Sequence, residues 1–162
     1  IGDLQAGALN EKISIPKTMD GPGVGTNPDE MLLGAASTCY SITLAAMLER
    51  NDILLEHLKV DAKGIVDVTK GTFTYEKITY HVAMKLTKES DEVKAIKLAK
   101  RAESSCMISR AIQGNIELET KNKKLLTGLS VTFYFNFYFS DVLRSQKVMY
   151  DDYLQVNNLQ EY

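Results

Sequence analysis

One apolar stretch constrains the fold of this chain more than any other feature. Residues 31–48 read MLLGAASTCYSITLAAML, and acidic or basic residues flank the stretch at both ends. This composition predicts a helix that is apolar on nearly all sides. A transmembrane span is the rival interpretation at this length, but four hydroxyl residues lie in its middle (Ser37, Thr38, Ser41 and Thr43) and no second span follows. We therefore expect a buried central helix.

The residues after this stretch show both strand and helix periodicity. Alternation of apolar and polar residues predicts strands at residues 11–15, 57–69, 73–87 and 116–119. The two long strands are expected to form a hairpin that turns near Lys70-Gly71. Between residues 90 and 103, apolar residues recur at helical spacing, which predicts an amphipathic helix. A short helical turn at residues 107–112 should follow and end at Gly114.

The last part of the sequence has an unusual pattern. Residues 129–139 alternate strictly, so that one face of the predicted strand is apolar and mostly Phe. An open face of this kind promotes aggregation, so we expect the protomer's own helices or a partner chain to cover it. Residues 141–156 are expected to add a final helix with Asp141 as its N-cap.

Composition and charge narrow the class of protein. The 162 residues are 44% apolar and 25% charged, which is typical of one globular domain that needs neither disulfides nor metal for stability. The net charge is −2 and the basic residues are scattered, so nucleic acid is not an expected partner. No basic region followed by a long apolar stretch lies at the N-terminus, so we expect a cytoplasmic protein that is not bound to a membrane.

The residues just before the apolar stretch have a structural explanation and a chemical one. Asn27 is a favoured helix N-cap, Pro28 suits the first helical position, and Glu30 completes an arrangement like a capping box. A carboxylate at a helix start, from Asp29 or Glu30, could also organise a cationic group or a polarised substrate. The residues alone favour the structural explanation and leave the chemical one open.

The two cysteines, Cys39 and Cys106, are the main candidates for chemistry. A free Cys inside an apolar helix is by default a small inert hydrophobe. Cys106 falls at a break between two predicted helices, where free N–H groups of the second helix could lower its pKa. The two thiols are either a redox pair or unrelated. His57 and His81 have no metal-site spacing, and the chain has no nucleophile elbow, phosphate-binding Gly loop or CxxC.

Two segments, one around each cysteine, carry a resemblance to a known family. The first is GTNPDE at residues 25–30 with LLGAASTCYSITL at residues 32–44. The second is AESSCMISRAI at residues 102–112 with GNIE at residues 114–117. In order and spacing they resemble the signatures of the OsmC/Ohr family of thiol-dependent hydroperoxide reductases. The resemblance covers about residues 7–120.

The resemblance implies a fold and an assembly. The family has an α+β fold with antiparallel sheets packed around two central helices, and two chains intertwine as a homodimer with the reactive thiols near the interface. Residues 1–162 would then be a single OsmC-like domain, in which residues 125–162 form an atypical C-terminal extension.

The resemblance also implies roles for individual residues. Cys39 corresponds to the thiol that attacks the peroxide, Cys106 to the resolving thiol, and Asp29 or Glu30 to the carboxylate that orients the site. No cofactor is implied beyond an external thiol reductant, such as a dithiol or a lipoyl protein. The family's first thiol has an arginine beside it from the N-terminal strand, whereas the first arginine here is Arg50. Without a cation, burial is expected to raise the pKa of Cys39.

The implied activity is a peroxidase that serves oxidative stress defence. The thiolate of Cys39 would attack an organic hydroperoxide, and the resulting sulfenic acid would condense with Cys106 to a disulfide. Apolar neighbours (Met31, Leu32, Met107 and Ile108) would suit alkyl or lipid hydroperoxides. The alternatives are an OsmC-like dimer that binds a small apolar ligand or a partner without peroxidase activity, and a structural oligomer joined through the Phe-rich tail.

Overall fold

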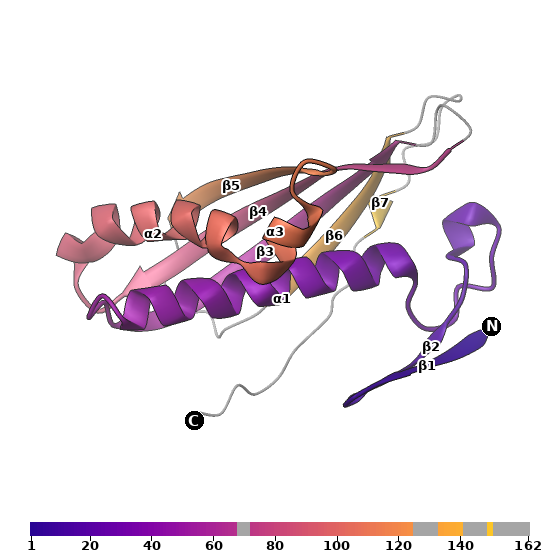
Figure 1. Ribbon diagram of the computed structural model, residues 1–162, viewed down its shortest axis with the longest axis horizontal. Coiled ribbons are helices and arrows are strands. Elements are labelled where there is room, and N and C mark those ends of the chain that lie inside the picture. Colours follow the sequence, from indigo (N-terminus) through magenta and orange to yellow (C-terminus); the bar gives the residue numbers. More distant parts are fainter. Residues whose placement is uncertain (68–71, 125–132, 141–148, 151–162) are drawn as a thin grey trace.

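The computed structural model describes residues 1–67, 72–124, 133–140 and 149–150 (Figure 1). The strands are β1 Gly2–Ala6, β2 Leu9–Ile13, β3 Leu55–Asp67, β4 Thr74–Leu86, β5 Glu117–Lys124, β6 Phe133–Ser140 and β7 Met149–Tyr150. The helices are α1 Pro28–Glu49, α2 Glu92–Ser105 and α3 Met107–Ile112, with two short 3-10 turns at Lys17–Met19 and Glu89–Asp91.

Five strands form the main sheet in the order β5-β4-β3-β6-β7. The antiparallel β3–β4 pair lies at its centre, with Val60 opposite Val82. β5 is parallel to β4 and β6 is parallel to β3. The α+β class is confirmed, but this sheet is mixed rather than purely antiparallel. The helices α2 and α3 lie between β4 and β5 in the sequence, and a crossover of this kind is what parallel neighbours need.

The three helices cover one face of the main sheet (Figure 1). Strand residues alternate between the helix-facing core and the opposite surface, as the burial pattern of β3 shows. The core contains the following fully buried side chains: Leu33, Tyr40, Leu44 and Leu48 of α1, Val60 of β3, Ile78, Tyr80 and Val82 of β4, and Ala99 and Ala102 of α2. The helix α1 therefore contributes four of these buried side chains to the core.

Only one side of α1 is buried by the described residues. Ala35, Thr38 and Ile42 lie on the other side and are exposed, Ile42 by 55%. The helix is long and apolar enough to cross a membrane, with a mean hydropathy of 1.6 over its most apolar 18 residues, of which 39% are buried. Its contacts with β3, α2 and α3 are those of a core helix.

The strands β1 and β2 form a separate two-stranded sheet that extends away from the main sheet (Figure 1). The sequence predicts β2, with its end displaced by two residues, but it does not predict β1. Thr26 joins this hairpin to the start of α1, because its N–H donates to the Lys12 carbonyl oxygen at 2.9 Å and its own carbonyl accepts from Ser14 at 3.1 Å. Gly25, with φ +70°, permits this approach, since a Cβ there would lie 1.9 Å from the Lys12 oxygen.

Of the two predictions for the C-terminal part, one is confirmed and the other is wrong where the structure describes it. A strand is confirmed over residues 133–139, and it pairs with β3 so that Phe133 lies opposite Val60. The predicted helix at residues 141–156 is wrong at Met149–Tyr150, which pair with β6 as the strand β7 because an unpaired edge of β6 offers backbone hydrogen bonds there. Asp141 and the expected turn at Lys70-Gly71 lie outside the described residues.

Candidate functional site: two hydrogen-bonded thiols

The structure brings Cys39 and Cys106 together although they are far apart in the sequence. Cys39 lies in the middle of α1 and is partly exposed, whereas Cys106 lies at the junction of α2 and α3 and is 0% exposed. Their side chains are hydrogen-bonded to each other. Both are free thiols. Since the residues alone left open whether the cysteines are related, this contact is the main finding at the site.

The backbone at Cys106 fixes the position of its thiol. Cys106 closes α2, because its N–H donates to the Ala102 carbonyl at 2.9 Å, and it then adopts an extended conformation (φ −66°, ψ 131°). The same residue is the N-cap of α3, and its Sγ accepts a hydrogen bond from the Ser109 N–H at 3.5 Å. A sulfur takes the place of the oxygen that usually caps a helix.

Opposing effects act on the Cys39 thiol. Burial raises its pKa, but hydrogen bonds from the Cys106 thiol, the backbone N–H groups of Ile108 and Met107, and the Thr43 side chain lower it, and the net direction is down. None of these groups is a cation. The expectation that burial without an arginine would raise this pKa is therefore wrong, because hydrogen-bond donors stabilise the thiolate instead.

The pKa of the Cys106 thiol shifts in the opposite direction, upward. Burial and then the neighbouring Cys39 raise its pKa, and the backbone N–H and the nearby side chain of Ser109 only partly offset this. The sequence suggests that the first N–H groups of α3 could lower the pKa of Cys106, and of these the Ser109 N–H does so. The structure instead directs the N–H groups of Met107 and Ile108 at Cys39, because α3 packs against α1. The arrangement favours a thiolate at Cys39 and a thiol at Cys106.

Buried hydroxyl groups lie behind the thiol pair. The rings of Tyr40 and Tyr80 stack with centroids 4.5 Å apart, and the Tyr40 hydroxyl donates to the Ala99 carbonyl at 2.9 Å. Burial raises the pKa of Tyr80 to about 12, the Ser109 side chain lowers it, and Cys106 is among the groups that raise it. Sequence reasoning placed Tyr80 on an apolar strand face and missed its place beside the thiols, which depends on tertiary packing.

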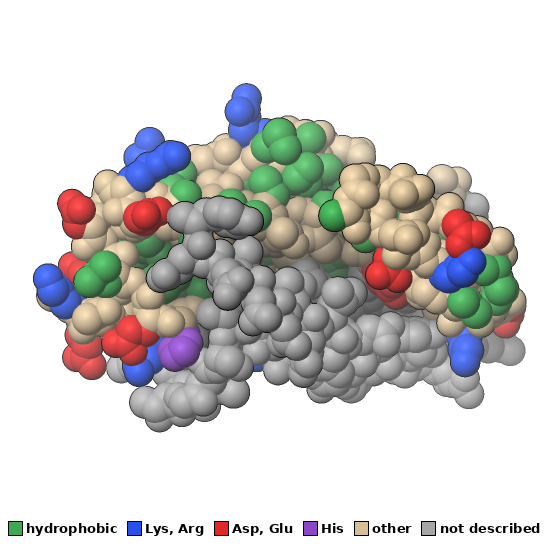
Figure 2. Space-filling view, turned by 90° about the horizontal axis from the view of Figure 1, so that it is seen from below, with side chains coloured by type: hydrophobic (Ala, Val, Ile, Leu, Met, Phe, Trp, Pro, Cys, Tyr) green, Lys and Arg blue, Asp and Glu red, His purple; other side chains and the backbone are tan. Residues whose placement is uncertain are grey.

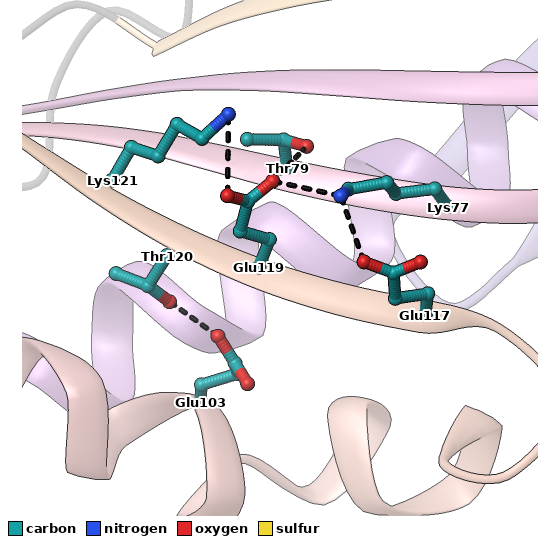
Figure 3. Close-up of polar contacts among 7 residues, drawn as sticks. All are labelled: Lys77, Thr79, Glu103, Glu117, Glu119, Thr120 and Lys121. Atoms are coloured by element: carbon teal, nitrogen blue, oxygen red, sulfur yellow. Dashed lines mark hydrogen bonds and ion pairs between the residues drawn. The ribbon is translucent and has the colours of Figure 1, made fainter.

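Glu103 adds a carboxylate to this region. It projects from α2 and accepts a hydrogen bond from the Thr120 hydroxyl of β5 (Figure 3). Figure 3 also shows a set of ion pairs on the opposite side of β5, where Lys77 contacts Glu117 at 2.7 Å and Glu119 at 2.9 Å. Sequence analysis gave no signal for Glu103, because its role depends on the packing of α2 against β5.

The acidic residues at the start of α1 are well separated from the thiols within one chain. Ten residues of helix span about 15 Å, so neither Asp29 nor Glu30 reaches Cys39 of the same chain. The Asn27 Oδ1 accepts from the N–H groups of Asp29 and Glu30, both at 3.0 Å, so the predicted N-cap is confirmed. Glu30 accepts from the Thr26 hydroxyl at 2.8 Å instead of the Asn27 backbone N–H that a capping box would use. Burial raises the pKa of Asp29.

The apolar residues expected around the thiols divide into two groups. Met107 and Ile108 lie beside Cys39, and Met107 is 71% exposed. Met31 and Leu32 lie about 10–12 Å further along α1, and Leu32 packs against the core. The thiols therefore have an apolar and accessible neighbour in Met107. Among the described residues, no group of three or more His, Cys, Asp or Glu is suited to a metal ion, and His57 and His81 lie on the strands β3 and β4.

Comparison with known proteins identifies the family. The family model for OsmC-like proteins matches residues 21–121, a range that contains both thiols and both acidic residues. The chain belongs to the OsmC-like protein family. A protein of Bacillus subtilis strain 168, the uncharacterised protein YmaD, is 58% identical over 131 residues, which are 79% of this chain and 87% of YmaD.

Solved structures of this family share the fold. An organic hydroperoxide resistance protein OsmC of Legionella pneumophila is 20% identical with a TM-score of 0.63, over 72% of this chain and 83% of that one. The organic hydroperoxide resistance protein OhrB of Bacillus subtilis is 24% identical with a TM-score of 0.54, over 72% and 84% of the two chains. The OsmC-like fold expected from the two motifs is confirmed.

Proposed function

We propose that this OsmC-like protein is a cytoplasmic peroxidase that reduces organic hydroperoxides to alcohols through Cys39 and Cys106. The observation that carries the proposal is the hydrogen-bonded thiol pair in which the partly exposed cysteine has the lowered pKa. A peroxidatic thiol needs both thiolate character and access to substrate. A resolving thiol needs proximity, which Cys106 has although it is buried.

The reaction follows from this asymmetry. The Cys39 thiolate attacks the outer oxygen of ROOH, the O–O bond breaks, and the alkoxide takes up a proton to leave as ROH. Cys39 becomes a sulfenic acid. The Cys106 sulfur then attacks the Cys39 sulfur, hydroxide leaves and is protonated to water, and a disulfide forms. An external dithiol or lipoyl protein returns both cysteines to thiols and is itself oxidised.

The neighbours of Cys39 support an organic substrate. Met107 presents a flexible apolar side chain that is 71% exposed, and Ile108 lies beside it. Figure 2 shows a group of hydrophobic side chains at the upper middle of the view, with basic side chains to its left and further charged side chains toward both ends. An alkyl or lipid chain would gain contact with such a surface, whereas hydrogen peroxide has no apolar part.

We propose a homodimer in which a second copy completes this site. The exposed side of α1 is apolar, and Gly34 leaves open space there for close approach. If two α1 helices pack antiparallel with their twofold axis at Gly34, Asp29 of one chain lies level with Cys39 of the other. Asp29 or Glu30 could then orient substrate across the interface, which neither can do within one chain. The hairpin of β1 and β2 projects from the core and is available to the same partner (Figure 1).

The proposed activity is tested by counting free thiols by mass spectrometry before and after one equivalent of cumene hydroperoxide. The expected result is a fall from two thiols to none with the loss of two hydrogens. Cys39→Ser should abolish peroxide consumption. Cys106→Ser, the matched variant, should allow one oxidation event and accumulate a sulfenic acid. Two thiols that survive excess hydroperoxide would overturn the proposal and favour a dimer that binds an apolar ligand or partner.

A further inference from the structure

The buried position of Cys106 raises the question of how its proton leaves. Its side chain is 0% exposed, so the thiol has no direct contact with solvent. In the reduced protein it donates a hydrogen bond to Cys39, and it must lose its proton to form a disulfide. A thiol attacks a sulfur only as the thiolate, so disulfide formation requires a polar route around Cys106.

Ser109 is the polar residue that the structure places at Cys106. Its N–H donates to Cys106 Sγ at 3.5 Å, and its side chain also lies within hydrogen-bonding distance of that sulfur. Ser109 is itself 1% exposed, and its hydroxyl, which lies near the sulfur and Tyr80, is buried with no hydrogen-bond partner of good geometry among the described residues. A buried hydroxyl without a structural reason for its position is uncommon, because burial of an unpaired hydroxyl costs stability.

A cavity adjoins Ser109, and neither Cys106 nor Cys39 lines it. It has a volume of about 210 Å³, and it is lined by Glu103, Ser104, Ser109, Gln113, Ile116 and Leu118. Four of these six side chains are polar, and the volume is sufficient for several water molecules. Ser109 thus lies between the buried thiol and a polar space that contains a carboxylate.

We propose that Ser109 is a positioning residue for Cys106, and that its hydroxyl links the thiol to the polar cavity so that the proton can leave during disulfide formation. The titratable groups that face Cys106 are Cys39 from α1 and Tyr80 from β4, while Glu103 from α2 acts on Tyr80 and lines the cavity, and the exposed Arg110 lies on α3. Tyr80 stays protonated near neutral pH because burial raises its pKa to about 12. Ser109 stabilises the Cys106 thiolate, and the cavity receives the proton.

The inference rests on the proposed function only in that Cys106 is the resolving thiol, so it can be tested without peroxide. A coloured aromatic disulfide, dithiobis-nitrobenzoate, reacts in two steps. The Cys39 thiolate attacks it, forms a mixed disulfide and releases one thionitrobenzoate. Cys106 then attacks the Cys39 sulfur, forms the internal disulfide and releases a second thionitrobenzoate and one proton. The two optical phases report the two thiols separately.

Ser109→Ala should leave the first phase unchanged and slow the second about tenfold near neutral pH. The variant keeps the backbone N–H bond and loses only the hydroxyl, so the pH midpoint of the second phase should rise and the rates should converge with wild type at high pH. Ser109→Thr should restore the wild-type profile. Ser104→Ala is the matched control, because Ser104 lines the same cavity but donates to the Arg101 carbonyl.

Three results would overturn the inference. The first is a second phase with the same pH midpoint in Ser109→Ala as in wild type. The second is uniform slowing at every pH, which would indicate a packing defect. The third is release of less than two equivalents by the wild-type protein. A peroxidase assay on the same wild-type sample tests the proposed function independently, because a protein that completes both phases and consumes no hydroperoxide would contradict only the function.

Discussion

At the scale of single residues, the pKa of Cys39 depends on groups from outside its own helix. Cys39 lies in the middle of α1, where its own helix offers no free N–H groups. The donors come instead from Met107 and Ile108 at the start of α3. Three parts of the chain therefore determine the pKa of Cys39: α1 itself, Cys106 and the start of α3. Hydrogen-bond donors, and not a cation, lower this pKa.

Thr43→Val should reduce the reactivity of Cys39. The Thr43 hydroxyl is one of the groups that lower the pKa of Cys39, and its single proton is shared between the Cys39 sulfur and the Cys39 carbonyl oxygen, which lies 2.8 Å away. Valine keeps the shape and removes the hydroxyl, so the pKa should rise and alkylation at neutral pH should slow about threefold. Iodoacetamide labelling across pH, followed by mass spectrometry, measures this. Thr38→Val, at an exposed site of the same helix, is the control and should leave the profile unchanged.

Asp29→Asn should stabilise the protein at neutral pH. Burial raises the pKa of Asp29, so the folded state binds its proton more tightly than the unfolded state does. Its charge therefore costs stability above the folded pKa, and this cost disappears as pH falls below the unfolded value of 3.8. The carboxylate is only about half-buried, so we expect a gain of about 0.5 kcal/mol near pH 7 that vanishes near pH 3. Urea unfolding at both pH values tests this, and an equal gain at both would contradict it.

At the scale of secondary-structure elements, the N-cap signal in the sequence determines more than the first residue of α1. Asn27 is 6% exposed and caps two N–H groups, and the segment before it is bonded to β2. The cap therefore fixes where α1 begins and how the hairpin of β1 and β2 joins it.

Asn27→Ala should cost about 1 kcal/mol of the free energy of unfolding, because Asp29 and Glu30 lose their common acceptor. Asp91→Ala is the matched control, since Asp91 is the N-cap of α2 but its side chain makes no capping bond. We expect that control to change stability by less than about 0.5 kcal/mol. Urea denaturation monitored by circular dichroism measures both variants, and equal losses would show that the Asn27 bonds contribute nothing specific.

The spacing of apolar residues in the sequence predicted the helices and strands that bury at least one face in the core. It gave α1, α2, α3, β3 and β4 close to their observed bounds, because their apolar residues face one core. It failed for β1 and β7, since β1 is mostly exposed and β7 is defined only by its pairing with β6. The residues of the candidate site also fall into those that the sequence identified and those that only the structure shows. Motif resemblance selected Cys39 and Cys106, but the direction of each pKa and the place of Tyr80, Ser109 and Glu103 depend on tertiary packing.

At the scale of the whole molecule, the single chain leaves its central helix half-covered. A helix apolar on nearly all sides is stable when both sides are packed, and α1 exposes Ile42 by 55% and Ala35 and Thr38 beside it. The chain buries one side of α1 against β3, α2 and α3. A second copy packed on the other side would complete the layer, and it would do so where Cys39 is partly exposed.

Co-expression of two inactive variants tests this assembly and the role of Asp29 together. In the proposed dimer, a chain carrying Asp29→Asn supplies Cys39, and a chain carrying Cys39→Ser supplies Asp29. Each mixed dimer then contains one complete site. Random pairing makes half of the dimers mixed, so turnover should recover to roughly a quarter of wild type. Co-expression of Cys39→Ser with Cys39→Ser/Asp29→Asn is the control and should recover none.

The same experiment distinguishes a partner's carboxylate from one that acts within the chain. If Asp29 served Cys39 of its own chain, no mixed dimer would hold a complete site, and activity would stay at the level of the Asp29→Asn homodimer. Ala35→Glu adds a second readout, because Ala35 is exposed on α1 beside Gly34, and a charge buried in the middle of the α1 pair should separate the chains. Light scattering of the eluted protein should then give the mass of one chain. Recovery of turnover that persists in this monomeric background would rule out the shared site.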